Sequence, residues 1–117
     1  MNQEKLMASG INYAEGLKRF SGKVPIYEKY LKQFMDDSNF LQLEKEMQDG
    51  AYADAFETAH ALKGVTGTLS IEKLYDIFCE LVEALRGNDT EKAEHIMPQV
   101  IAEYQKIMGI LRDACAE

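Results

Sequence analysis

The sequence predicts an all-α protein, an antiparallel up-and-down four-helix bundle preceded by one or two short N-terminal helices. Apolar residues recur at spacings of three and four along most of the chain, and strand-like alternation is nowhere sustained. Glycines stand between the periodic segments, where helices commonly end. Because the connections near Gly50, Ser70 and Gly87 are only a few residues long, the helices that they join must be antiparallel neighbours.

In the N-terminal part, residues 3–20 are expected to hold one or two short helices. A longer helix is predicted from about Pro25 towards Gln48. Its apolar stripe loses phase over residues 36–39, so we expect this helix to kink or split there. The stripe consists of Tyr27, Tyr30, Leu31, Phe34 and Leu41.

After a helix over residues 52–69, residues 70–86 predict an amphipathic helix with one apolar stripe. We expect Ser70 to cap this helix and Gly87 to end it. The stripe consists of Ile71, Leu74, Phe78, Leu81 and Leu85.

The last helix is predicted to start at Asn88 or Asp89. Pro98 lies inside it and is expected to bend the helix or to mark a local break. Its apolar stripe consists of Ala93, Met97, Val100, Tyr104, Ile107 and Leu111.

Composition points to one folded domain over residues 1–117. The chain is 46% hydrophobic and 28% charged, so it can bury a core. Thirteen Lys and Arg against twenty Asp and Glu give a net charge of −7, which argues against binding nucleic acid. Cys79 and Cys115 have no metal-ligand spacing. The sequence has no run of about 18 apolar residues and no signal-like start, so we expect a cytoplasmic protein without a membrane span. Nothing in the sequence calls for an oligomer, and we expect a monomer.

The helix over residues 52–69 contains two interior glycines, each of which costs about 1 kcal/mol relative to alanine. At 100° per residue, both glycines lie on one arc, away from the core-facing side of the helix. The arc comprises His60, Lys63, Gly64 and Gly67, with Ala53 and Phe56 one to two turns upstream. The core-facing side comprises Ala55, Ala59, Leu62, Thr66 and Leu69.

The residue types on this arc suit a carrier of phosphoryl groups. An unperturbed imidazole is largely neutral at cell pH, so His60 offers a lone pair that can attack phosphorus. Lys63, one turn along, can offset the negative charge of a phosphoryl group on the ring. The glycines leave space for the active site of another protein to approach the histidine. Phe56, if exposed, would be an apolar anchor for that partner.

Residues 59–74, AHALKGVTGTLSIEKL, resemble the motif of histidine-containing phosphotransfer (HPt) domains. That motif is roughly A-H-x-L-K-G-x-x-G-x-x-G, followed by an amphipathic helix. Upstream features also resemble the bacterial stand-alone members, so the resemblance covers nearly the whole chain: Gly10-Ile11, Arg19-Phe20 and Tyr27-x-x-Tyr30-Leu31-x-x-Phe34. One departure is Ser70, which stands where many members have glycine, and we expect the turn to survive it.

The resemblance implies a phosphorelay module of two-component signal transduction. His60 would accept a phosphoryl group from a receiver-domain aspartate, hold it as phosphohistidine and pass it reversibly to another receiver. Lys63 would stabilise the charge, Gly64 would admit the receiver, and Gly67 would extend the open surface. The implied partners are response-regulator receivers and a hybrid histidine kinase. Mg²⁺ would lie on the receiver, with no cofactor or metal on this chain. Since no P-loop or kinase glycine-rich segment is present, we expect a phosphocarrier and not an enzyme.

Other interpretations of the same residues stay open. The main alternative is a non-covalent helical adaptor that binds a partner through the same face. The glycines could instead allow close packing between helices, although this is less expected because they lie away from the core-facing side of the helix. They could also end the helix early, near Gly64. Phe56 lies at the edge of the core, so it could be buried instead of contacting a partner. Arg86 could reach towards a phosphoryl group, but a basic residue at a helix C-terminus is already explained by the helix dipole. His95 has no small or basic neighbours and is expected to be a surface residue. A metal- or ligand-binding bundle would need His or carboxylate pairs facing the core, and the stripes show none.

Overall fold

The computed structural model describes residues 1–7 and 10–116. Its elements are α1 (Gln3–Met7), α2 (Tyr13–Arg19), α3 (Val24–Met35), α4 (Asn39–Gln48), α5 (Tyr52–Thr68), α6 (Glu72–Arg86) and α7 (Thr90–Cys115). The all-α prediction is confirmed for this part of the chain, in which the one strand-like pairing is an isolated bridge between Ile11 and Ile71. None of these helices is both long and apolar enough to cross a membrane.

The N-terminal segment folds as predicted, into two short helices followed by a longer helical region that splits. The side chain of Asn12 caps α2 by accepting a hydrogen bond of 3.2 Å from the amide of Glu15. Pro25 lies in the first turn of α3, where no intrahelical donor is needed. Between α3 and α4 the carboxylate of Asp37 accepts a hydrogen bond of 2.8 Å from the amide of Asn39. The predicted loss of phase is therefore a break between two helices.

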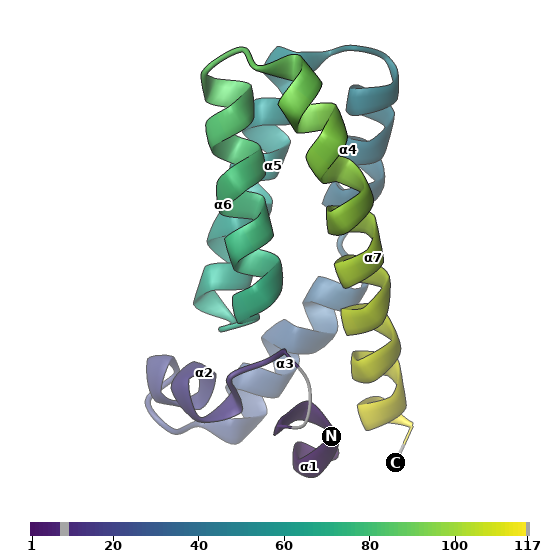
Figure 1. Ribbon diagram of the computed structural model, residues 1–117. Coiled ribbons are helices and arrows are strands. Elements are labelled where there is room, and N and C mark those ends of the chain that lie inside the picture. The colour runs from purple at the N-terminus through teal and green to yellow at the C-terminus, as the bar shows by residue number, and fades with distance from the viewer. Residues whose placement is uncertain (8–9, 117) are drawn as a thin grey trace.

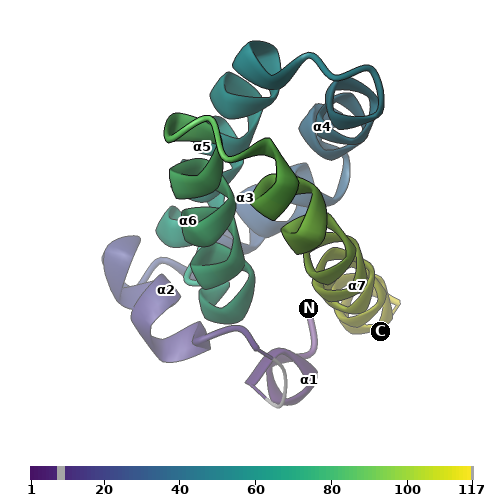
Figure 2. The ribbon, with the colours of Figure 1, turned by 45° about the horizontal axis from the view of Figure 1, so that its top comes forward.

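The helices α4 to α7 run antiparallel to their neighbours along the chain (Figure 1). The helix α5 packs against both α4 and α6, and α6 packs against α7, an order that Figure 2 shows from another side. The rings of Phe40 on α4 and Tyr104 on α7 stack with centroids 3.7 Å apart, which connects these two helices. The helices α2 and α3 lie across the lower end in Figure 1, and α1 packs against α7.

Most of the predicted apolar stripes meet inside this arrangement. The largest fully buried side chains are Tyr27, Phe78, Leu6, Leu31, Leu43, Leu62, Ile71, Leu74, Leu81, Ile107, Leu111 and Val82. Among the predicted stripe residues, Tyr30 and Leu41 are exposed, by 42% and 69%, and Tyr104 is half-buried. The break before α4 changes which face of that helix meets the core, so Phe40 and Leu43 are buried in place of Leu41.

The prediction that Ser70 caps α6 is wrong. The N-cap residue is Ile71, and the Ser70 hydroxyl is buried with no hydrogen-bond partner among the described residues. Ser70 instead adopts a φ of +57°, in the left-handed region that favours glycine. Its carbonyl accepts a hydrogen bond of 2.8 Å from the amide of Asn12, which ties the turn to the segment before α2. The turn thus survives the serine, in a conformation that suits glycine better.

The remaining helix ends agree better with the sequence. Gly87 is the C-cap of α6. Asp89 caps α7 with a carboxylate that accepts a hydrogen bond of 3.1 Å from the amide of Lys92. Pro98 lies inside α7, which continues on both sides of it, so the alternative of a local break is wrong.

Replacing Ser70 with glycine should raise the free energy of unfolding by about 1 kcal/mol, because it removes both the left-handed strain and the unpartnered hydroxyl. Urea unfolding monitored by circular dichroism measures the change. Ser21 also has a φ of +57°, but it is exposed. Ser21→Gly therefore reports the strain without the buried hydroxyl and should gain less. A loss of stability in Ser70→Gly would contradict this account.

Candidate functional site

One face of α5 is open to solvent, and it is the face that the sequence singles out. His60 and Gly64 are exposed, and Lys63 is half-buried. The opposite face carries Ala55, Ala59, Leu62 and Thr66, all of them buried. The helical period within α5 thus places an imidazole and an ammonium one turn apart on the outside of the protein.

The two glycines of α5 have different surroundings. A Cβ atom at Gly64 would meet no heavy atom within 4 Å, so this position is open. A Cβ atom at Gly67 would lie 2.9 Å from the ring of Tyr75 on α6. Close helix packing, the less expected interpretation from the sequence, therefore applies at Gly67. Gly67 lies on the predicted arc and lines the cleft described below, but the ring of Tyr75 takes up the space that its missing side chain leaves. The expectation that Gly67 extends the open surface is therefore wrong.

The exposed face of α5 forms one wall of a cleft of about 560 Å³, to which α2 and α6 also contribute. The lining residues are Glu15, Arg19, His60, Lys63, Gly64, Thr66, Gly67, Thr68, Ser70, Glu72, Tyr75 and Asp76. Three segments that are distant in sequence thus surround the histidine with charged and polar groups. The cleft is suited to a charged group on His60 that remains accessible from outside.

The charges of this cleft are only partly compensated within the chain. Arg19 Nε lies 3.8 Å from Glu15 Oε1. Glu72 Oε1 accepts a hydrogen bond of 2.7 Å from Asn12 Nδ2. Within the described part of the chain, Lys63 forms no ion pair. Its ammonium is therefore available to a negative group held at His60.

At the other end of the face, an aromatic ring connects His60 to a second cation. The half-buried ring of Phe56 has its centroid 6.1 Å from that of His60. The guanidinium carbon of Arg86 lies 5.3 Å from the centroid of the Phe56 ring. Arg86 Nε also lies 3.3 Å from Glu83 Oε1. The position of Arg86 at the end of α6 is therefore explained by its contact with Phe56 as well as by the helix dipole.

Hydrogen bonds within and beyond α5 hold this face in place despite the glycines. The hydroxyl of Thr68 donates to the carbonyl of Gly64 at 2.9 Å. Past the helix end, the buried hydroxyl of Tyr27 donates to the carbonyl of Leu69 at 2.7 Å. Burial raises the pKa of Tyr27, and Tyr13 adds to the shift, so the hydroxyl keeps its proton. The position of α5 is therefore anchored from α3.

No metal site is evident in the residues that the structure describes, where no three His, Cys, Asp or Glu side chains lie close enough together to hold an ion. One inward-facing carboxylate was not expected from the stripes. Glu103 on α7 is buried, with Oε1 3.5 Å from Lys73 Nζ on α6. This carboxylate is paired with a lysine and lies outside the lining of the His60 cleft.

The sequence led to the α5 residues of the cleft but not to those on other elements. Arg19, Glu15, Tyr75 and Asp76 reach it from α2 and α6. Nothing in the local spacing of these residues relates them to His60. Their contribution depends on how three helices pack, which periodicity along one segment does not reveal.

No family model matches the chain, and no match was found among curated proteins or solved structures.

Proposed function

We propose that this protein is a cytoplasmic phosphorelay module of the HPt type, with His60 as the residue that carries the phosphoryl group. The observation that supports this most is an exposed imidazole with two neighbours on the same face. One is Lys63, which forms no ion pair with any described residue, and the other is Gly64, which has no side chain. These features suit a nucleophile that must be reached by the active site of another protein.

In the proposed reaction, the Nε2 atom of His60 attacks the phosphorus of an acyl phosphate on a receiver-domain aspartate. A phosphorus–nitrogen bond forms as the phosphorus–oxygen bond to the aspartate breaks, and the aspartate leaves as a carboxylate. The other ring nitrogen keeps its proton during the attack. In the reverse direction, a carboxylate of the same or another receiver takes the phosphoryl group, and the imidazole is restored.

Lys63 and the rigidity of α5 are the contributions of this chain to that transfer. The ammonium lies one helical turn from the imidazole, where it offsets charge on the bound phosphoryl group. The Mg²⁺ ion that neutralises the acyl phosphate belongs to the receiver. Because the sequence offers a nucleophile but no P-loop or kinase glycine-rich segment, we propose that the protein acts as a phosphocarrier and not as an enzyme.

We further propose that α4 to α7 act as one four-helix bundle. Their antiparallel order and the ring stack between α4 and α7 support this description. A bundle of this kind is stiff, and stiffness keeps the imidazole oriented for in-line transfer.

The experiment that tests the function is phosphoryl transfer from a receiver domain labelled with acetyl phosphate. Wild-type protein should acquire acid-labile label, and His60→Gln should acquire none, because the nucleophilic nitrogen is lost. His95→Gln serves as a matched control, since His95 is also an exposed helical histidine. It should be labelled like the wild type. Equal labelling of His60→Gln and wild type would disprove the assignment.

The second candidate is an adaptor that binds the same partners without covalent chemistry. It is favoured by the half-buried Phe56 ring and the open surface at Gly64. Both functions predict binding at this face. The labelling experiment separates them, because an adaptor would bind a receiver and remain unlabelled.

A further inference from the structure

An apolar groove of about 650 Å³ lies between α3 and α5, next to the His60 cleft. Its apolar lining residues include Phe20, Tyr30, Phe34, Val65 and Leu69. Its one charged lining residue is Asp37, which follows α3 and whose carboxylate accepts a hydrogen bond from the amide of Asn39. Gly64 and Thr68 line both the groove and the cleft. Any protein that approaches His60 over Gly64 is therefore also placed over this groove.

Exposed apolar side chains extend the groove along the outer face of α3. Ile26 and Tyr30, one turn apart, are 40% and 42% exposed. The ring of Tyr30 stacks on that of Phe20, with centroids 5.4 Å apart, so it is held in place although it faces solvent. Ordered aromatic and apolar side chains beside a groove are typical anchors in protein interfaces.

The chain has a pronounced division of charge, and most of α3, which lines the groove, belongs to its basic segment. Residues 18–32 contain five Lys and Arg and one acid, a net charge of +4, whereas the rest of the chain contains eight Lys and Arg and nineteen acids, a net charge of −11. The one acid, Glu28, lies 3.1 Å from the N-terminal amine. Four lysines of this segment form no ion pair with any described residue: Lys18, Lys23, Lys29 and Lys32.

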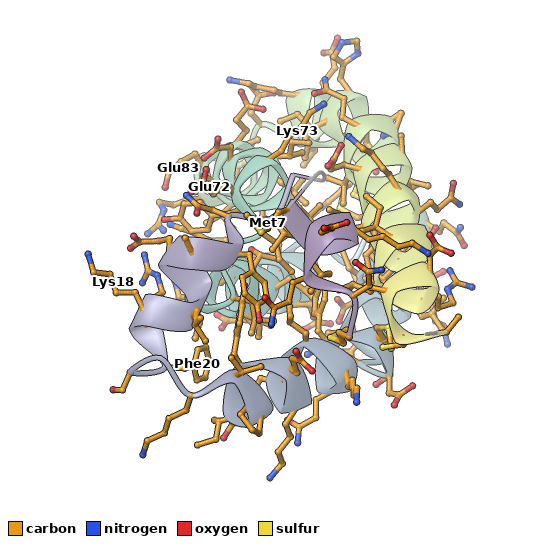
Figure 3. All side chains as sticks on the ribbon, turned by 90° about the horizontal axis from the view of Figure 1, so that it is seen from below. Met7, Lys18, Phe20, Glu72, Lys73 and Glu83 are labelled. Carbon is orange, nitrogen blue, oxygen red and sulfur yellow. The ribbon has the colours of Figure 1, made fainter. Side chains whose placement is uncertain are left out.

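The positive charge of this segment points outward, while acids gather on α6. In Figure 3, Lys18 projects away from α2, and nitrogen-tipped side chains extend outward from α3. Glu72 and Glu83 of α6 lie on the same side of the protein as Lys18 in this view. Glu72 and Asp76 also line the His60 cleft. The histidine face thus lies between a basic border on α2–α3 and an acidic border on α6.

We propose that the α3–α5 groove and the lysines beside it form a specificity-determining docking surface for a receiver domain that presents an apolar ridge bordered by acidic side chains. This inference rests on the proposed function. The groove takes the apolar ridge, and the unpaired lysines attract the acids next to it. The acidic border on α6 repels the same acids, so only one orientation of the receiver brings its aspartate to His60.

A protein partner explains these features better than a polyanion does. The apolar groove offers nothing to phosphate groups, and the large negative charge outside residues 18–32 repels a long polyanion. Lys23 and Lys29 stand three residues before and after the exposed Ile26, so these two lysines flank an apolar side chain, as charged residues border the core of a protein interface.

The test compares two phosphorylated receivers, one with Asp and Glu around its phosphorylation face and one with Lys and Arg there. At about 20 mM NaCl, wild-type protein should accept phosphate from the acid-bordered receiver about tenfold faster than from the receiver bordered by Lys and Arg. This preference should shrink when the NaCl concentration is raised to about 500 mM. The double variant Lys23→Glu/Lys29→Glu should lose the preference. Ile26→Ser should slow phosphoryl transfer from both receivers roughly several-fold, because it removes an apolar contact between Ile26 and the receiver.

The matched control is Lys92→Glu/Lys106→Glu, which changes the net charge equally on exposed positions of α7. It should keep the preference. If both double variants lose it equally, only total charge matters and the docking surface is wrong. If both receivers exchange phosphate with the wild type at equal rates, the proposed function stands and this inference fails. If neither exchanges phosphate, the proposed function fails and this inference with it. Binding of a short single-stranded RNA that depends on Lys23 and Lys29, without a receiver preference, would also overturn it.

Discussion

Gly64→Gln protein should fold at least as stably as the wild type, yet exchange phosphate with a receiver about a hundredfold more slowly. A side chain at this position meets no atom of the protein within 4 Å, so it adds no strain. Replacing an exposed helical glycine also improves helix propensity by roughly 0.5–1 kcal/mol. The new side chain lies one turn from His60 on the same face, where it occupies the space through which a receiver must approach.

Two measurements separate this steric effect from a chemical one. Phosphoramidate is a small phosphodonor that reaches an exposed imidazole without docking, so it should label Gly64→Gln and wild type at similar rates. Gly109→Gln is the matched control, because Gly109 is an exposed glycine of α7 with no heavy atom within 4 Å of a Cβ. It should gain similar stability and transfer normally. Normal transfer by Gly64→Gln would remove the argument for an open approach at this position.

Gly16→Ala should destabilise the protein by about 3 kcal/mol. A Cβ atom at Gly16 would overlap the Tyr27 hydroxyl and the ring carbon that bears it. Tyr27 cannot move aside easily, since it is fully buried and donates a hydrogen bond to the carbonyl of Leu69. The methyl group must therefore push α2 away from α3. Thermal and urea unfolding should show the loss as a lower melting temperature and a lower urea midpoint.

The double variant Gly16→Ala/Tyr27→Leu tests the cause of this loss. The smaller leucine removes the ring that the methyl group meets, so the alanine should cost much less in this background than in the wild type. Gly64→Ala controls for helix propensity, because the same change at an open position should be neutral or stabilising. If Gly16→Ala unfolds at the wild-type temperature, α2 does not pack on Tyr27 as described.

The two glycines of α5 show why equal sequence signals have different structural causes. Both Gly64 and Gly67 interrupt a helix and fall on the same arc, so periodicity alone treats them alike. The helix α6 then distinguishes them, because Tyr75 covers Gly67 and nothing covers Gly64. Only the position of a neighbouring helix reveals which glycine leaves a surface open and which allows close packing.

Ser70 illustrates a second limit. Its side chain is a common N-cap and stands before an apolar stripe, so its residue type predicted a cap. The backbone there must turn from α5 into α6 while its carbonyl bonds to Asn12, and this turn requires a positive φ. The preference of serine for an N-cap position contributes little free energy, and the backbone geometry needed to connect two packed helices outweighs it.

Local periodicity predicted the helices, a kink or split near residues 36–39 and an exposed histidine with its lysine, because each depends on residues within a few turns of one another. The composition of the His60 cleft, the position of the basic segment relative to it and the packing of Tyr27 against Gly16 depend instead on how separate helices pack. Spacing along the chain carries no information on such contacts. They arise only when α2 and α3 pack across the ends of α5 and α6 and bring their side chains to a shared surface.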